Sequence, residues 1–243
     1  MHIENENTMI EKLEFCSIFS YCPRDESDEG LLAIKLKNCI KNDEIIKIKR
    51  TTFKEGRKVT IEEVPTSQYA AEVLKRLVNE RYFSDFFQKD TILIPVPRAT
   101  PIKKDQLWPS FQIAKAMENE GLGVVRPILV RTKPVPKSSL VPPKQRPKPK
   151  DHYESMGINK VVKLDSQKLL LVDDVVTRGH TFMGAAWRLK REFSNVEIKA
   201  FAAMRTISDK SKFKKYYDPV RGVIFYRHKK GDCLRRESRI LKV

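Results

Sequence analysis

Residues 168–181 read K-L-L-L-V-D-D-V-V-T-R-G-H-T, and this stretch decides the fold. Its apolar start, residues 169–172, is short and uninterrupted, as in a strand that is buried on both faces of a parallel sheet. Two adjacent carboxylates, Asp173 and Asp174, follow it. Beyond the turn at residues 177–181, apolar residues recur at three- and four-residue steps, which indicates an amphipathic helix. Polar groups are therefore expected at the end of a central strand.

The turn between this strand and this helix suits a phosphate. A helix N-terminus has unpaired N–H groups and a partial positive charge. Gly179 lets the backbone approach a ligand closely or adopt a positive φ, and the hydroxyls of Thr177 and Thr181 add donors. The carboxylates repel a phosphate and suit sugar hydroxyls or a hard cation such as Mg²⁺. The two groups together predict a ligand with both a phosphate and a sugar diol.

The order of four apolar residues, two acids, two apolar residues and T-x-G-x-T resembles the phosphoribosyl pyrophosphate (PRPP) motif of type I phosphoribosyltransferases. The resemblance implies that Asp173 and Asp174 hold the ribose 2′- and 3′-hydroxyls, act in catalysis and reach Mg²⁺ through water. It also implies that the 5′-phosphate is bound by the five residues of the turn, Thr177, Arg178, Gly179, His180 and Thr181. An ordinary buried strand with a solvated acidic pair is the alternative.

A second part of the resemblance follows the strand predicted at residues 91–96. Residues 95–98 read P-V-P-R, and further basic residues and a predicted helix come next. This run is most similar to the ComF-type, competence-associated phosphoribosyltransferase-like proteins. Loops after strand ends carry ligand contacts in α/β sheets. By resemblance, Arg98, Lys103 and Lys104 contact the pyrophosphate of PRPP, although a solvated loop charge is an equal alternative for each lysine.

Residues 131–151 are rich in proline and basic side chains and have little apolar surface. Such a segment cannot build a core of its own and is expected to be flexible. A loop of this length between two strands of one sheet is more often a lid or a binding loop than a linker. Type I phosphoribosyltransferases carry a flexible catalytic loop at this place. The resemblance therefore makes Lys144 and Arg146 candidate catalytic cations at the leaving pyrophosphate.

The rest of the chain alternates predicted strands and helices. Parallel strands joined by helices predict an α/β, Rossmann-like, mostly parallel sheet flanked by helices, which is the type I phosphoribosyltransferase fold by resemblance. A short edge strand is also expected at residues 152–156. The remaining patterns predict strands at residues 13–21, 44–53, 58–63, 91–96, 124–130, 196–204 and 221–226, and helices at residues 31–40, 66–88 and 109–121.

Two regions are predicted in the chain. Residues 1–65 are expected to form a mixed α/β N-terminal extension, and residues 66–243 the phosphoribosyltransferase core. The resemblance implies a variable hood, built from terminal segments, that holds the acceptor base. The N-terminal extension and the basic C-terminal tail, residues 228–243, are the candidates for this hood.

The balance of charge points to an anionic partner. Lys and Arg outnumber Asp and Glu by 48 to 31, which gives a net charge of +17. Either a polyphosphate site on a diffusely basic surface or nucleic-acid binding accounts for this excess. The sequence has no run of 18 apolar residues, so no membrane span is expected. The absence of a signal-peptide pattern and of C-x-x-C pairs predicts a cytoplasmic protein with reduced thiols.

By resemblance, the protein is an enzyme that displaces pyrophosphate from C1 of PRPP, or of a related sugar phosphate, with a nitrogen nucleophile and with Mg²⁺ as cofactor. Thr177 stands where the 6-oxopurine enzymes carry an acidic general base, which argues against purine salvage. A PRPP or nucleotide hydrolase with a toxin or defence activity is one alternative. A non-catalytic, PRPP-sensing regulator that binds nucleic acid is the second, and an inactive structural scaffold is the third. A homo-oligomer or a protein partner stays open.

Overall fold

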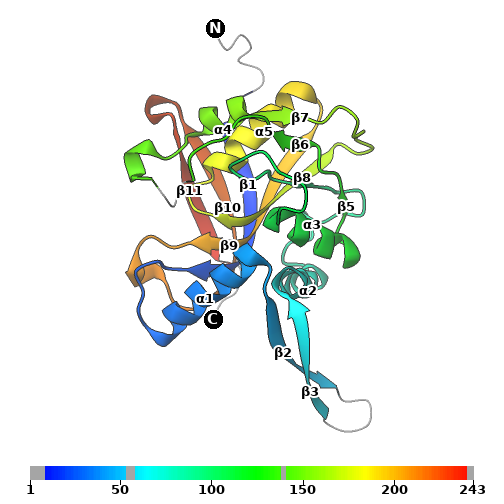
Figure 1. The fold of residues 1–243 in the computed structure, drawn as a ribbon, viewed down its shortest axis with the longest axis vertical. Coiled ribbons are helices and arrows are strands. Elements are labelled where there is room, and N and C mark those ends of the chain that lie inside the picture. The colour runs from blue at the N-terminus through cyan, green and yellow to red at the C-terminus, as the bar shows by residue number, and fades with distance from the viewer. Residues whose placement is uncertain (1–8, 53–57, 138–140, 240–243) are drawn as a thin grey trace.

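The computed structural model describes residues 9–52, 58–137 and 141–239, and a seven-stranded sheet forms its centre (Figure 1). The strands of this sheet are β1 (Lys12–Tyr21), β4 (Ile92–Pro95), β5 (Val124–Val125), β8 (Lys168–Val176), β9 (Glu197–Thr206), β10 (Tyr217–Arg227) and β11 (Asp232–Arg239). The helices are α1 (Asp28–Asn42), α2 (Thr66–Asn79), α3 (Pro109–Asn119), α4 (Pro149–Ser155) and α5 (His180–Glu192).

The strand order in the sheet is β11-β10-β1-β9-β8-β4-β5. The five strands from β1 to β5 in this order are parallel, whereas β10 and β11 are antiparallel to their neighbours. Two small antiparallel pairs accompany this sheet, β2 (Ile45–Thr52) with β3 (Lys58–Pro65) and β6 (Leu129–Arg131) with β7 (Met156–Ile158). The α/β architecture with a mostly parallel sheet flanked by helices is therefore confirmed.

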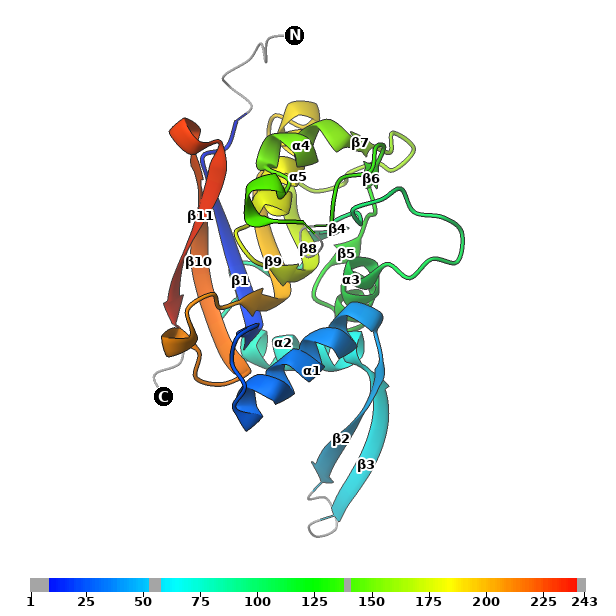
Figure 2. The same ribbon diagram turned by 60° about the vertical axis from the view of Figure 1, so that its left-hand side comes forward.

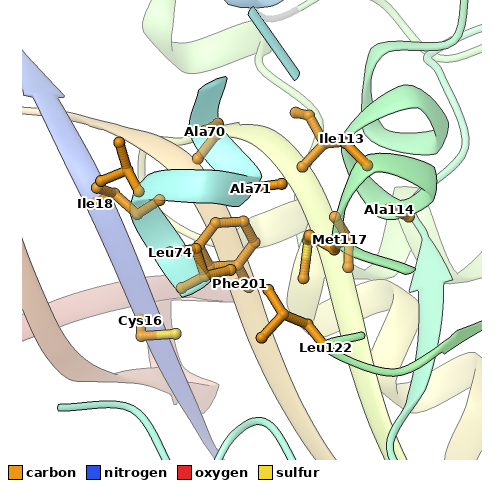
Figure 3. Close-up of a cluster of buried hydrophobic side chains, with 14 of the residues drawn as sticks. Cys16, Ile18, Ala70, Ala71, Leu74, Ile113, Ala114, Met117, Leu122 and Phe201 are labelled. Carbon is orange, nitrogen blue, oxygen red and sulfur yellow. The ribbon is translucent and has the colours of Figure 1, made fainter. Parts of the chain in front are cut away.

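The apolar run at residues 169–172 lies in the middle of the sheet because both of its faces are covered. Leu170 and Val172 pack in a core with α2 and α3, and Leu169 and Leu171 pack in a second core with α5. Figure 3 shows the first core, where Ala70, Ala71 and Leu74 of α2 face the side chains of α3 and of Phe201. Alanines at these positions let α2 approach the sheet closely, since they carry only one side-chain carbon.

Several predicted boundaries differ from the structure. The strand expected at residues 152–156 is wrong, because residues 149–155 form α4. Proline at the first turn of α4 and the bond from the Lys148 N–H to Asp151 Oδ2, 2.7 Å, favour a helix start there. The helix expected at residues 66–88 ends at Asn79, and Arg81 adopts a positive φ of 68°. Pro127, which lacks an N–H, separates β5 from β6 in the predicted strand at 124–130.

Residues 12–21 lie within the central sheet, although they fall in the predicted N-terminal extension. β1 pairs with β9 on one side and with β10 on the other. Most of its side chains are buried, which agrees with its apolar-rich sequence. The remainder of this region, α1 and the β2–β3 hairpin, stands outside the sheet, and the hairpin projects away from the body in Figures 1 and 2. β11, from the basic tail, forms the sheet edge beside β10.

The order of the strands creates a topological switch point at the carboxyl ends of β4 and β8. From β4 the chain continues through α3 to β5, whereas from β8 it continues through α5 to β9 in the opposite direction. A crevice forms at the carboxyl ends of two neighbouring strands where connections diverge in this way. α1 lies across the carboxyl ends of the parallel strands (Figure 2). No helix within the described residues has the length and apolarity needed to cross a membrane.

Candidate functional site

The acidic pair lies inside β8, near its carboxyl end. Pairing with β9 continues past the pair to Val176, so the strand is longer than its apolar run. Asp173 Oδ1 accepts the N–H of Asp174 at 2.9 Å, and Asp174 Oδ1 accepts the N–H of Val175 at 2.8 Å. These local bonds fix both carboxylates near the carboxyl end of β8, where each residue is half-buried.

The two carboxylates destabilise each other's charge. The pKa of Asp173 is raised well above its usual range, because surrounding atoms displace water and because Asp174 lies beside it. Lys41 of α1 opposes this shift, with Nζ 3.4 Å from Asp174 Oδ2. The Asp174 carboxylate in turn raises the pKa of Lys41, although burial opposes it. Such a pair favours a ligand that brings hydroxyl donors or a cation.

The turn at residues 177–179 presents unused N–H groups. Gly179 has a φ of 87°, and a Cβ atom there would lie 2.5 Å from Ile224 Cδ1, so the position requires glycine. No acceptor within the described residues binds the backbone N–H groups of residues 178–181. These groups lie at the positive end of the α5 dipole. The turn is therefore suited to an anion, and Thr177 borders it, with Oγ1 2.9 Å from Thr206 Oγ1.

Arg235 of β11 holds the backbone directly before this turn. Its Nη1 donates to the carbonyl of Val176 at 2.7 Å, and its Nη2 donates to the carbonyl of Thr206 at 2.6 Å. The guanidinium also pairs with Glu237 at 2.8 Å. One side chain thus joins the carboxyl ends of β8 and β9. Sequence reasoning missed Arg235 because its charge is one of many in a basic tail.

Two arginines, Arg98 in the loop after β4 and Arg131 at the end of β6, lie close together in different surroundings. Arg98 is half-buried, and its Nη1 donates to the carbonyl of Leu107. Arg131, only 5% exposed, donates from Nε to the carbonyl of Arg98 at 2.8 Å and from Nη1 to Ser155 Oγ at 2.5 Å. Burial lowers the pKa of Arg131 to about 10, and the nearby Asp173 opposes this shift. Arg131 is therefore a buried cation beside the acidic pair, and sequence reasoning did not single it out.

The two predicted pyrophosphate lysines lie apart from these groups. Lys103 and Lys104 are exposed on the loop between β4 and α3, which extends away from the sheet in Figure 2. In the part of the chain that the structure describes, neither side chain forms an ion pair. A contact of these lysines with pyrophosphate stays a prediction that requires the loop to approach the sheet.

Lys144 and Arg146 meet the turn in a cavity of about 370 Å³. The residues that line it are Lys144, Arg146, Lys148, Arg178, His180, Lys230 and Asp232. Neither Asp173 nor Asp174 lines this cavity. The structure thus brings four predicted site residues together, but beside the turn rather than at the acidic pair. Lys148 and Lys230 were missed, since only folding places them next to Arg178.

His152 of α4 contacts the first turn of α5. It is 5% exposed, and its Nε2 lies 3.4 Å from Thr181 Oγ1. Burial, with Arg131 and His180 nearby, lowers its pKa to about 3. The imidazole is therefore neutral at physiological pH. At Gly184 a Cβ atom would lie 2.5 Å from the carbonyl oxygen of Pro149, which shows how closely α4 packs on α5.

No family model matches this chain, and no curated protein sequence matches it significantly. The resemblance to phosphoribosyltransferases therefore stays a prediction from the sequence motif. Within the described residues, no cluster of three or more His, Cys, Asp or Glu side chains forms a metal site. Asp173 and Asp174 supply two hard oxygen ligands. They fit Mg²⁺, which usually keeps several waters and binds substrate phosphates.

Proposed function

We propose that the protein binds PRPP, or a related phosphorylated sugar, with Mg²⁺ and displaces pyrophosphate from C1 with a nitrogen nucleophile. One observation carries the proposal. The acidic pair and the unused N–H groups of the turn follow one another at the end of a central strand, at the point where the sheet connections diverge. A sugar diol and a phosphate on one ligand match these two groups.

The proposal assigns each part of this edge a role. Asp173 and Asp174 accept hydrogen bonds from the ribose hydroxyls. These bonds offset the loss of water and the repulsion from Asp174 that raise the pKa of Asp173. The N–H groups of residues 178–181 bind the 5′-phosphate. Lys41 balances the charge of Asp174. Mg²⁺, when bound, neutralises charge on the pyrophosphate.

The leaving group determines where cations act selectively. Negative charge grows on the pyrophosphate as the bond between ribose C1 and the pyrophosphate oxygen breaks. A cation beside the pyrophosphate therefore stabilises the transition state more than the ground state. Arg98, in the loop directly after β4, is the best-placed candidate. Lys103 and Lys104 are further candidates on the same loop. A contribution of Lys144 and Arg146 at this position stays a prediction, because they lie in the cavity beside the turn.

A PRPP-sensing regulator that binds nucleic acid is the second candidate. The net charge of +17 favours it, because a basic surface neutralises backbone phosphates. Such a protein would bind PRPP at the same edge without turnover.

Phosphorus NMR of Mg²⁺ and PRPP with the protein, alone and with a panel of bases, tests the proposal. We expect pyrophosphate release that depends on one base and is lost in Asp173→Asn/Asp174→Asn. A matched control is Asp90→Asn/Asp165→Asn, which removes two exposed carboxylates from the loops that precede β4 and β8. This control should release pyrophosphate as the wild type does.

The other outcomes separate the alternatives. Release without any base, absent from the Asp173→Asn/Asp174→Asn variant, identifies a hydrolase. Broadening of the PRPP signals without turnover, again dependent on the acidic pair, identifies a sensor. An unchanged PRPP spectrum with every base would overturn the proposed function.

A further inference from the structure

The cavity beside the turn is formed by three segments that are distant in sequence. They are residues 144–148, the start of α5, and the tip of the β10–β11 hairpin. Lys148 Nζ donates to the carbonyl of Lys230 at 3.2 Å, and His180 Nδ1 lies 2.9 Å from the carbonyl oxygen of Pro147. Figure 1 shows the segment before α4 next to β11. The volume of about 370 Å³ is within the range of small-ligand sites.

Five cationic side chains surround this space, with only one carboxylate among its lining residues. In the part of the chain that the structure describes, none of the five forms an ion pair. The one carboxylate that lines the cavity, Asp232, already binds Arg227 through both oxygens, at 2.8 and 2.7 Å. Like charges around one cavity repel each other and attract a counter-ion. The five cations are Lys144, Arg146, Lys148, Arg178 and Lys230.

Two buried polar atoms of residues that line this cavity have no hydrogen-bond partner within the described residues. They are Arg146 Nε and His180 Nε2. The carbonyl oxygen of Pro147 can only accept a hydrogen bond, so Nδ1 of His180 carries the proton. Nε2 of the neutral ring is therefore unprotonated. An anion in the cavity would accept from Arg146 Nε, and it would favour a second proton on His180. Unsatisfied buried polar atoms in a native fold call for an explanation of this kind.

The number of charges selects the kind of anion. A single phosphate monoester carries only about −1.5 to −2 at pH 7, which leaves most of the five cations without a counter-charge. A chain of three phosphates carries about −4 and spans several cations at once. We propose that this cavity is a second anion site, which binds a linear oligophosphate: an inorganic polyphosphate or the triphosphate chain of a nucleotide.

This site is separate from the proposed ribose-phosphate site and does not depend on it. Neither Asp173 nor Asp174 lines the cavity. The two sites use different parts of the turn: its backbone N–H groups serve the sugar phosphate, and the side chains of Arg178 and His180 serve the oligophosphate. Asp173 and Asp174 therefore belong to the ribose-phosphate site alone, and Lys148 and Lys230 belong to the cavity alone.

Calorimetric titration with tripolyphosphate tests the site. We expect Lys144→Gln/Lys230→Gln to weaken binding by about tenfold or more, because it removes two of five cations. Lys160→Gln/Lys163→Gln is the matched control, since it removes two exposed lysines from the loop before β8. The control and Asp173→Asn/Asp174→Asn should both bind tripolyphosphate as the wild type does. Equal weakening in the cavity variant and the lysine control would overturn the proposal.

Further arms of the titration identify the source of the phosphates. Equal affinity for ATP and tripolyphosphate shows that the chain alone is recognised, and a tighter ATP complex assigns the site to a nucleotide. Inorganic phosphate should bind much more weakly than either, and equal affinity for it would overturn the oligophosphate assignment. A single-stranded RNA that binds more tightly than both and depends on Lys144 and Lys230 would overturn it in favour of nucleic acid.

Proton uptake gives a second readout. Titrations in buffers of different ionisation enthalpy should show proton uptake on tripolyphosphate binding near pH 7, reduced in His180→Asn. Burial lowers the pKa of His180, and the positive charges of Arg178 and Lys148 lower it further. The hydrogen bond to the Pro147 carbonyl and the negative charge of Asp232 each raise it. A bound anion acts in the opposite direction to the two cations. Unchanged proton uptake in His180→Asn would show that the anion does not contact this ring.

Discussion

At the scale of single residues, Asp173 places a negative charge where burial and Asp174 disfavour it. Its carboxylate is held beside Asp174 by the bond to the Asp174 N–H, and its pKa is raised by burial and by that neighbour. A native pKa above the unfolded value means that the native state binds the proton more tightly. The free energy of unfolding therefore falls as pH rises from the unfolded pKa, about 3.9, towards the raised native value.

We expect Asp173→Asn to stabilise the fold at pH 7 while abolishing PRPP binding. The amide oxygen keeps the bond to the Asp174 N–H but carries no charge, so unfolding should cost about 0.5–2 kcal/mol more. Urea unfolding at several pH values measures this, and the gain should vanish at the acidic end. Asp174→Asn is the comparison, because it also removes the partner of Lys41 and should stabilise less. A loss of stability at pH 7 in Asp173→Asn would contradict this account.

At the scale of elements, the edge strand β11 determines the geometry of the central turn. Arg205, 1% exposed, pairs with Asp218 of β10 at 2.5 Å and with Glu237 of β11 at 3.0 Å. Glu237 also pairs with Arg235, which holds the ends of β8 and β9. This network, in which Arg205 is buried and Glu237 is exposed, connects four strands of the sheet. Arg235 of the basic tail therefore holds the backbone before the turn through the carbonyls of Val176 and Thr206.

We expect Arg235→Lys to loosen this turn. An ammonium lacks the planar fork that reaches two carbonyls at once, so the variant should unfold at about 1–3 kcal/mol lower free energy. PRPP affinity should fall as well, because the turn loses its support. Arg236→Lys is the matched control, since Arg236 is exposed and its guanidinium lies 5.5 Å from the Phe225 ring centroid. Wild-type stability and PRPP affinity in Arg235→Lys would contradict a positioning role.

At the scale of the whole molecule, the excess of positive charge opposes folding. A net charge of +17 spread over a compact protein of 243 residues repels itself. Dissolved ions screen this repulsion, with a Debye length that shortens to about 10 Å at 0.1 M salt. An anion that binds a specific cation cluster stabilises in addition, because it binds the native state only.

We expect sodium chloride, raised from about 0.02 to 0.2 M, to increase the melting temperature by about 2–4 °C, the effect of about 1 kcal/mol in a protein of this size. Tripolyphosphate at matched ionic strength should add a further increase. Lys144→Gln/Lys230→Gln should keep the response to chloride and lose the additional response to tripolyphosphate. A melting temperature that falls with chloride would show that attractive ion pairs outweigh the repulsion.

The elements of the core were predictable because their signals are local. The apolar run of β8, the amphipathic pattern of α5 and the glycine at φ 87° each depend on residues a few positions apart. The helix at residues 149–155 was not predicted, because the proline in its first turn and a capping bond outweigh the strand-like pattern of these residues. The exact strand ends were not predicted, because pairing with β9 extends β8 past its apolar run and the acidic pair to Val176.

The sequence by itself determined the α/β class of the fold and the succession of strand, acidic pair, turn and helix. Only the tertiary structure decided which cations surround these groups. Lys41 reaches Asp174 from α1, Arg235 reaches the turn from β11, and Lys230 meets Lys144 across a cavity. These approaches depend on strand order and on helix packing, which bring together segments far apart in the chain. Local patterns encode elements, but such distant contacts are set by how the elements pack.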